Sequence, residues 1–469
     1  MNNFVTNVLY MINKKLSRKI ENLRFLCQND STILLLWIGE RRGQSMFKFW
    51  GGKKQLERQT MQYWEDTSYM LGLVHPKCDY TLDENVFERI RNIEDVTLQA
   101  RSLPSEENPG RLLISYHGEE YELEFEYGEY EAKDLLNVCT LQFFTKEEMA
   151  LLEQSKYALT TAMKFGKKFE DAYQLQVKIL YAMIGLESIA IYDESAEYIM
   201  NRRWAEIFVQ SEVGALYNNL YHVQAVVKGD KLWLHTHGLS RCGVDELEIL
   251  NVNKKDYSAY YSLLTVYASH KLDGNTENTI YIGVDTNGKE IVVRALPWTE
   301  ALNYYPKNVL GGIADRQESH NTQSRVLFFV DEENEEEQEL HHVSENIDEL
   351  EKDVLYYWSN ELTEKTYKLA RERFSYVIRA LKEGIEVRIK VLFQGESQEE
   401  IVWVKAERFL EEEQTIVGTL ANHLFFSREF DMGDEMICPI KSLVDWTICL
   451  GEFYIHPDSA YVLDLYRNA

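Results

Sequence analysis

The sequence predicts a multidomain α+β protein, with α/β sandwich modules followed by a small C-terminal antiparallel β-barrel of SH3-like or OB-like size. Three observations lead to this prediction. The chain has 469 residues, more than one compact core usually holds. Segments with strand alternation and segments with helical spacing follow one another up to about residue 330. Beyond about residue 385, short alternating strands come at close spacing, which is typical of a small barrel.

Residues 1–60 form a basic N-terminal extension. They contain eleven Lys and Arg against four Asp and Glu, which is +7 of the total of −27, so the remaining chain carries −34. Apolar residues from Val5 to Leu23 keep helical spacing with basic residues among them, which predicts an amphipathic basic helix. Such a helix either makes peripheral membrane contact through residues 1–30 or docks on the acidic body of the same chain.

Residues 61–145 are predicted to form a small α+β domain. A strand over 69–74 (YMLGLV) precedes a helix over 83–93 (DENVFERIRNI) and a second strand over 96–103. The stretch RLLISYHGEEYELEFEY over 111–127 alternates on both sides of His117-Gly118, which predicts a hairpin that turns at this pair.

Residues 146–330 are predicted to form a central α/β domain. Its strands are expected at 158–166, 188–193, 222–229, 232–237, 245–250 and 325–330, and its helices at 170–184, 195–210 and 256–270. Gly185 is expected to end the first of these helices. A hairpin over 279–296 is expected to turn at Asn287-Gly288, because this pair readily adopts positive φ angles.

Residues 331–353 are predicted to be an acidic linker, since DEENEEEQE at 331–339 has seven acidic residues and no basic one. Residues 354–469 are predicted to form the C-terminal β-barrel domain, with a helix near 363–374 and then strands alone. Trp403 and Trp446 each lie within an apolar alternation and are predicted to be core residues; an aromatic binding platform is the alternative.

Composition excludes several classes of function. An excess of 77 acidic over 50 basic residues argues against nucleic acid as a partner, because phosphate binding needs a concentrated Lys and Arg footprint. The six cysteines have no C-x-x-C spacing, which argues against a zinc knuckle and a secreted disulfide framework. No apolar run is long enough to span a membrane, and the N-terminus lacks the order of a signal peptide. These observations predict a cytoplasmic location.

Two parts of the chain resemble known families. The stretches FEDAYQLQVKILYAMIGLESIAIYDESAEYIMNRRW and LWLHTHGLSRCGVDELEIL resemble the bacterial domain-of-unknown-function family 4026, over most of the chain from about Tyr69. The pieces EEIVWVKAERF, TIVGTL and GDEMICPIKSLVDW resemble domain-of-unknown-function family 2314, over about 361–449. Neither resemblance implies an activity. Related modules lie near toxin–immunity systems, which makes an immunity or partner-binding role an analogy.

One stretch, LWLHTHGLSRCGVDELEIL, could hold a metal. Strand alternation places His235 and His237 on one face of their strand, and Glu246 and Glu248 on one face of the next. Two imidazoles with a carboxylate and open positions suit zinc or iron(II). The alternative is an ordinary sheet with cross-strand His–Glu contacts, in which Arg241 pairs with Glu246 or Asp245.

The residues therefore leave two functions open. The leading interpretation is a non-enzymatic interaction or immunity-type binding protein without a cofactor, whose partner is a basic protein because the body is acidic. The alternative is a metal-dependent hydrolase that uses His235, His237 and Glu246 or Glu248.

Overall fold

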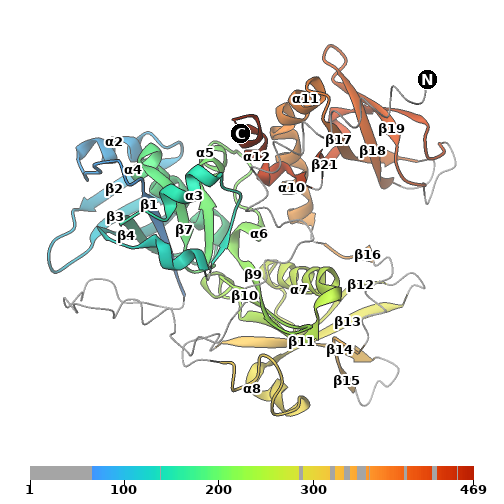
Figure 1. Ribbon diagram of the computed structural model, residues 1–469, viewed down its shortest axis with the longest axis horizontal. Coiled ribbons are helices and arrows are strands. Elements are labelled where there is room, and N and C mark those ends of the chain that lie inside the picture. Colours follow the sequence, from blue (N-terminus) through green and yellow to red (C-terminus); the bar gives the residue numbers. More distant parts are fainter. Residues whose placement is uncertain are drawn as a thin grey trace.

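The computed structural model describes residues 66–137, 139–284, 289–316, 323–331, 339–345, 355–358, 360–395, 399–424, 430–451 and 453–468. Within these ranges the chain builds three β-sheets, each with its own helices, as Figure 1 shows. The predicted mixture of helices and several β-sheets is confirmed. The basic extension, the Asn287-Gly288 turn and most of the acidic linker lie outside the described residues.

The first sheet has the strand order β2-β3-β4-β6-β1-β7-β8-β5. Its strands are β1 (Thr67–Val74), β2 (Val96–Ser102), β3 (Gly110–Tyr116), β4 (Glu119–Glu129), β5 (Thr140–Leu141), β6 (Tyr157–Lys164), β7 (Ser188–Asp193) and β8 (Tyr198–Asn201). The helices are α2 (Glu84–Arg91), α3 (Lys146–Leu152), α4 (Phe169–Ile184), α5 (Arg202–Val209) and α6 (Tyr217–Leu220). Every residue of β1 is buried, because both faces of this strand are covered. Met70 belongs to the core shared with α4, and Leu71 belongs to a separate core on the opposite face.

Local sequence explains where these elements begin and end. Thr145 and Glu148 form a reciprocal capping box at the start of α3. Gly185 follows α4 with φ of +41°, as expected for a glycine that ends a helix. His117 and Gly118 both have positive φ and close the β3–β4 hairpin. The predicted helix over 195–210 is wrong in its first part, because β8 occupies Tyr198–Asn201 and α5 starts only at Arg202.

The second sheet has the order β16-β12-β13-β14-β11-β10-β9, and β15 also pairs with β14. Its strands are β9 (His222–Lys228), β10 (Lys231–His237), β11 (Glu246–Asn253), β12 (Thr279–Val284), β13 (Glu290–Pro297), β14 (Ser324–Asp331), β15 (Glu339–His342) and β16 (Leu355–Tyr356). Helix α7 (Tyr257–Leu272) packs on one face, and α8 (Trp298–Ala301) contacts β13 and β14 on the other. Strand β15 lies within the stretch predicted as a linker.

A buried ion pair joins these two parts of the chain. Arg241, in the turn before β11, donates two hydrogen bonds of 2.8 Å to the carboxylate of Asp193 at the end of β7. It also donates to Ser68 Oγ and to the carbonyl oxygen of Leu220. The predicted pairing of Arg241 with Glu246 or Asp245 is therefore wrong, and Asp245 pairs instead with Arg325.

The predicted division at 145/146 falls inside the first sheet, since β6, β7 and β8 pair with strands that precede it. The sequence patterns did not predict this, because strand pairing joins segments that are far apart in the chain. We therefore propose a division between about residues 214 and 222, where the first sheet gives way to the second.

The C-terminal sheet is open, with the order β20-β19-β18-β17-β21-β22, and the barrel prediction is not confirmed. Its strands are β17 (Glu386–Gln394), β18 (Glu399–Leu410), β19 (Thr415–Leu420), β20 (Glu435–Pro439), β21 (Leu443–Leu450) and β22 (Phe453–Ile455). Three helices accompany the sheet: α10 (Asn360–Glu372), α11 (Phe374–Lys382) and α12 (Val462–Asn468). The prediction of strands alone after the first helix missed α11 and α12, whose apolar residues fill this core. The helices cover one sheet face, so the sheet need not close on itself.

The two tryptophans of this sheet lie on different faces. Trp446 is fully buried in the C-terminal core and donates its Nε1–H to the carbonyl oxygen of Ala370 at 2.9 Å, which confirms the core prediction for this residue. Trp403 is only half-buried and lies under the ammonium of Lys390, 4.7 Å from its ring centre. The core prediction for Trp403 is therefore wrong, because it faces away from the helices.

The last helix, together with the two residues before it, connects the C-terminal sheet to the first one. Tyr461 and Leu465 belong to the core of the first two sheets, whereas Ala460 and Leu463 belong to the C-terminal core. The hydroxyl of Tyr461 accepts a hydrogen bond from the backbone N–H of Phe143 at 3.0 Å. Figure 1 shows α12 beside α5 and α11, where the two parts meet.

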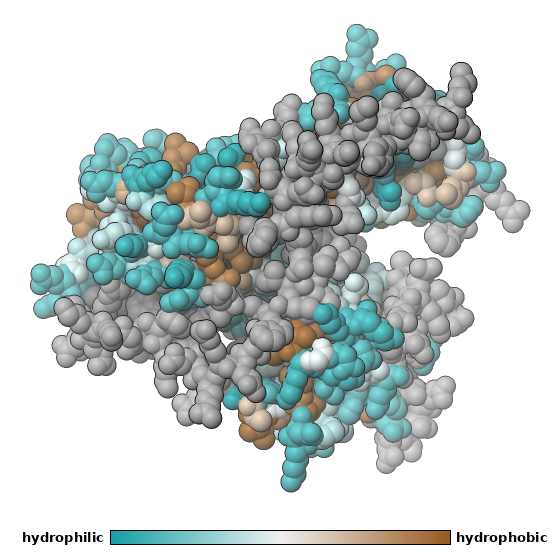
Figure 2. All heavy atoms as spheres, in the orientation of Figure 1, coloured by the Kyte–Doolittle hydropathy of each residue, from teal (hydrophilic) through white to brown (hydrophobic). Residues whose placement is uncertain are grey.

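Where Figure 2 colours the surface by hydropathy, hydrophilic residues prevail and apolar residues gather in small areas. None of the helices in the described part of the chain combines the length and apolar character needed to cross a bilayer.

Candidate functional site

The four predicted metal-site residues lie on the neighbouring strands β10 and β11, where the imidazole rings of His235 and His237 meet edge to face, 4.8 Å apart between their centres. His235 and Glu248 are direct cross-strand partners, so they share a face as the alternation predicted. Glu246, Glu248 and His235 are buried, and the side chain of His237 is 11% exposed. The stretch is therefore part of the interior of the second unit, and its carboxylates need compensating donors there.

One donor to Glu248 is Arg316, which lies in the loop before β14. The sequence patterns did not predict this contact. The guanidinium of Arg316 forms a bidentate pair with the Glu248 carboxylate, with Nη1 2.9 Å from Oε1 and Nη2 also in contact with Oε2. Trp233 donates its indole N–H to Oε2 at 3.0 Å. The same guanidinium lies between the rings of Trp298 and Trp233, at 4.5 and 5.2 Å from their centres.

Glu246 is held by donors from its own hairpin. Oε2 accepts the Thr236 hydroxyl at 2.6 Å, and Oε1 accepts the backbone N–H groups of Gly238 and Ser240 at 2.9 and 3.0 Å. Burial raises the pKa of Glu246, and these hydrogen bonds oppose that rise. The carboxylate thereby fixes the turn between β10 and β11, which is a structural role.

His237 lies next to the turn between β7 and β8 in the first unit. Nε2 of His237 lies 3.8 Å from Oε2 of Glu197, and the same oxygen accepts a hydrogen bond from Gln224 at 2.8 Å. Burial lowers the pKa of His237 to about 4 and that of its cross-strand neighbour His222 to about 4. Both imidazoles are therefore neutral at neutral pH.

These contacts favour a structural role for the stretch. Across the described ranges, no group of three or more His, Cys, Asp or Glu side chains has the geometry to hold a metal ion. A metal at His235, His237, Glu246 and Glu248 stays a prediction. Burial raises the pKa of the Cys242 thiol to about 12, so this residue is a poor nucleophile at neutral pH.

A second pair of strands, β3–β4, presents an open acidic surface. Along β4 the side chains that alternate with the core residues are four glutamates: Glu120, Glu122, Glu124 and Glu126. We call them the carboxylate face. Neighbouring members are about 7 Å apart, as side chains two residues apart in a strand are. Their core-facing neighbours Tyr121, Leu123 and Phe125 are buried, which fixes the orientation of the whole row.

Among the described residues, one arginine and one glutamine contact the first three members of the carboxylate face. Arg111 on β3 lies 3.5 Å from Glu122 and 2.8 Å from Glu124, and Gln99 donates a hydrogen bond to Glu120. Leu113, two residues after Arg111 on β3 and opposite Glu122 on β4, is 37% exposed. The alternation of this hairpin was recognised in the sequence, but its glutamates were not singled out, since the chain has so many acidic residues.

Two family models match the chain. Residues 68–214 match the model described as protein of unknown function (DUF4026) N-terminal, and residues 223–328 match the corresponding DUF4026 C-terminal model. The chain belongs to this family. The two DUF4026 regions meet where the first sheet gives way to the second. Comparison with curated proteins and with solved structures gave no match. The resemblance of the C-terminal part to family 2314 stays a prediction.

Proposed function

We propose that this DUF4026 protein is a non-enzymatic binding protein that recognises a basic protein through the carboxylate face. The observation that carries the proposal is the row of glutamates on one sheet face, in which Glu120 and Glu122 are exposed and Glu124 is half-buried beside Arg111. A rigid strand holds the carboxylates at fixed spacing, so binding does not require ordering a loop.

Charge gives this surface its selectivity. The chain carries −34 outside its first 60 residues, so its long-range field attracts a basic partner and repels nucleic acid. Complementary charge raises the association rate and sets the orientation of encounter. Leu113 provides an apolar contact next to the carboxylates, where a partner side chain can exclude water. An inhibitor of a basic toxin would need the same properties, which is why an immunity-type role fits.

The experiment compares capture of partners from native cytosol by two variants of equal charge. The test variant carries Glu120→Gln, Glu122→Gln and Glu124→Gln on the carboxylate face. The control carries Glu411→Gln, Glu412→Gln and Glu413→Gln, three exposed glutamates in the turn between β18 and β19. We expect a basic protein that the wild type and the control both capture at low salt, and that the test variant does not.

The captured protein is then purified, and its affinity for each variant is measured as a function of salt. Loss of three charge contacts should weaken binding at least tenfold, with a shallower salt dependence. Equal affinity of the test and control variants would show that overall charge, and not the carboxylate face, is responsible. A partner that carries no basic surface would contradict the proposal altogether.

A further inference from the structure

A groove opens where the C-terminal domain meets the first unit. It has a volume of about 650 Å³, within the range of small-molecule sites. One wall comes from the end of α5 and the loop after it, through Ile207, Gln210, Glu212 and Val213. The other comes from α10 and α11, through Lys368, Arg371, Glu372, Arg373, Ser375 and Tyr376.

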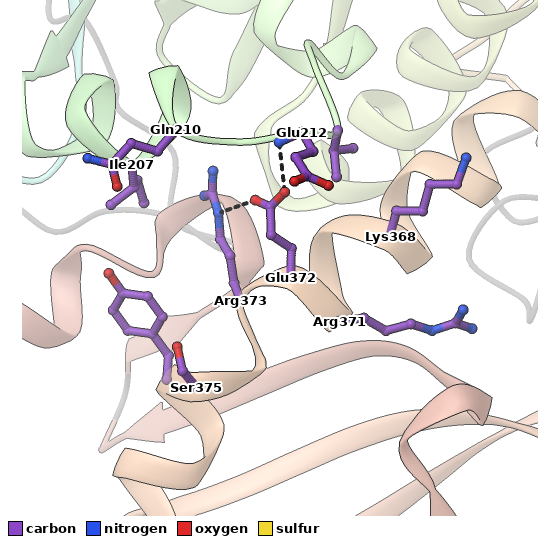
Figure 3. Close-up of a pocket in the computed structure, with 10 residues that line it drawn as sticks. Ile207, Gln210, Glu212, Lys368, Arg371, Glu372, Arg373 and Ser375 are labelled. Atoms are coloured by element: carbon purple, nitrogen blue, oxygen red, sulfur yellow. Dashed lines mark hydrogen bonds and ion pairs between the residues drawn. The ribbon is translucent and has the colours of Figure 1, made fainter. Parts of the chain in front are cut away.

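The centre of the groove is held together by the chain's own contacts. Glu372 accepts a hydrogen bond from the backbone N–H of Glu212 at 2.9 Å, and its Oε1 lies 3.8 Å from Nε of Arg373. Arg373 is buried and donates to the carbonyl oxygen of Pro457 at 2.8 Å. Figure 3 shows these residues in the middle, with Ile207 and Gln210 to one side. Arg373 and Glu372 thus position the walls.

On the other side of Glu372 the groove is lined by two cations, Lys368 and Arg371. Lys368 and Arg371 are one helical turn apart on α10, both are exposed, and Figure 3 places them on the same side of Glu372. Neither has a carboxylate within 4.0 Å among the residues that the structure describes, although Lys365 on the same helix pairs with Glu170. Arg371 donates Nε–H to the carbonyl oxygen of Leu443, which leaves Nη1 and Nη2 for another acceptor.

Lys368 and Arg371 together give one end of the groove two positive charges. We propose that this groove binds a small organic oxyanion, a carboxylate or phosphate compound, whose charged group pairs with Lys368 and Arg371. The guanidinium fork and the ammonium supply directional and point-charge recognition of oxyanion oxygens. Ile207 and Tyr376 offer contacts for the organic part of the ligand.

The groove lies between two units, so its occupant would bridge them. The units also meet through Asp458, which accepts hydrogen bonds from Trp204 Nε1 and Asn219 Nδ2 at 3.2 and 3.3 Å. A ligand that touches both walls stabilises the docked arrangement, because it binds only when the walls are together. This inference is independent of the carboxylate face, which lies on the β3–β4 hairpin.

The test is isothermal titration of the full-length protein with pyrophosphate and with citrate, which represent the phosphate and carboxylate classes. Ionic strength is held constant with sodium chloride. We expect at least one probe to bind with one-to-one stoichiometry and to raise the melting temperature. The variant with Lys368→Gln and Arg371→Gln should weaken that binding at least tenfold. Which probe responds identifies the oxyanion class.

A matched control carries Lys382→Gln and Lys405→Gln, two exposed cations elsewhere in the C-terminal domain. It should bind the probe as the wild type does. Both variants should melt at the wild-type temperature without probe, since all four side chains are exposed. Absence of binding by both probes, or an equal loss in the test and control variants, would overturn the proposal.

Discussion

Two antiparallel strand pairs of this chain carry alternating glutamates, and the fold places them in opposite environments. On β11, Glu246 and Glu248 are buried, and both oxygens of each carboxylate accept hydrogen bonds from the protein. On β4, Glu120 and Glu122 are exposed to solvent, although their sequence pattern is as regular. The difference arises from what packs over each pair, because a sheet face without a covering segment stays solvated.

The covering segment of β10–β11 comes from far along the chain. Residues 301–310, together with Trp298, pack against Trp233 and Leu250, and Arg316 follows in the same loop. The β3–β4 hairpin has α2 and α4 on its buried face, where Phe87 contacts Phe125. Buried carboxylates therefore need hydrogen-bond donors or a cation from the protein itself, whereas exposed ones leave their charge available to other molecules.

The largest effect on stability is expected from removing Arg316, the cation that pairs with the buried carboxylate of Glu248. Arg316→Met leaves the Glu248 carboxylate buried without its ion pair, so the free energy of unfolding should fall by about 3–5 kcal/mol in urea denaturation. Adding Glu248→Leu should recover much of that loss, because the buried charge is then gone. Arg111→Met, the counterpart on the open pair, should change stability by less than about 1 kcal/mol. If Arg316→Met and Arg111→Met changed the free energy of unfolding equally, the buried β10–β11 pair and the open β3–β4 pair would not differ as proposed.

The C-terminal sheet allows a similar comparison between a buried tryptophan, Trp446, and a half-buried one, Trp403. Trp446→Ala should lower the free energy of unfolding by about 3–5 kcal/mol, because it empties a core site and strands the carbonyl oxygen of Ala370. Trp403→Ala should cost less than half as much, since the ring is half-buried on the face opposite the helices. Chemical denaturation of both variants tests this. A Trp403 effect as large as that of Trp446 would show that Trp403 is packed in a core.

How far the sequence could predict this molecule follows from these examples. Alternation predicted β3, β4, β10 and β11 correctly, because it depends only on neighbouring residues. It also predicted that His235 and Glu248 would share a face. It could not show that Arg316, 68 residues later, pairs with Glu248, nor that β6 joins the sheet of β1, because both depend on long-range packing. Helix α11 was missed for another reason: only strands were expected after the helix near 363–374.

An intermediate effect is expected on the pH dependence of stability. The folded state lowers the pKa of His237 from 6.5 to about 4, so the unfolded chain takes up the proton first as pH falls. This contribution to stability is complete above pH 6.5 and is lost toward pH 4, by about 2 kcal/mol at pH 5. His237→Asn should flatten the decline in the free energy of unfolding between pH 6.5 and 5.

A second variant checks the sign of this effect. Desolvation, with Glu197 and Asp193 nearby, raises the pKa of Glu194 to about 7. Its contribution to stability is complete below the unfolded value of about 4.5 and is lost as pH rises through 7, which is opposite to the histidine. Glu194→Gln should therefore reduce the loss of stability between pH 5 and 8. An unchanged pH profile in both variants would show that the β7–β8 turn does not desolvate these groups.

The smallest effect is expected on the open strand pair, at Glu122. Its ion pair with Arg111 spans 3.5 Å between side chains that are 60% and 55% exposed, so solvent screens most of the attraction. Glu122→Gln should leave the free energy of unfolding within about 0.5 kcal/mol of the wild type, and 1 M sodium chloride should remove even that difference. Glu248→Gln provides the matched buried change, in which Arg316 loses its partner, and several kcal/mol should be lost. A large loss for Glu122→Gln in the same denaturation series would mean that another part of the protein covers the carboxylate face, and the face would then be unavailable to a partner.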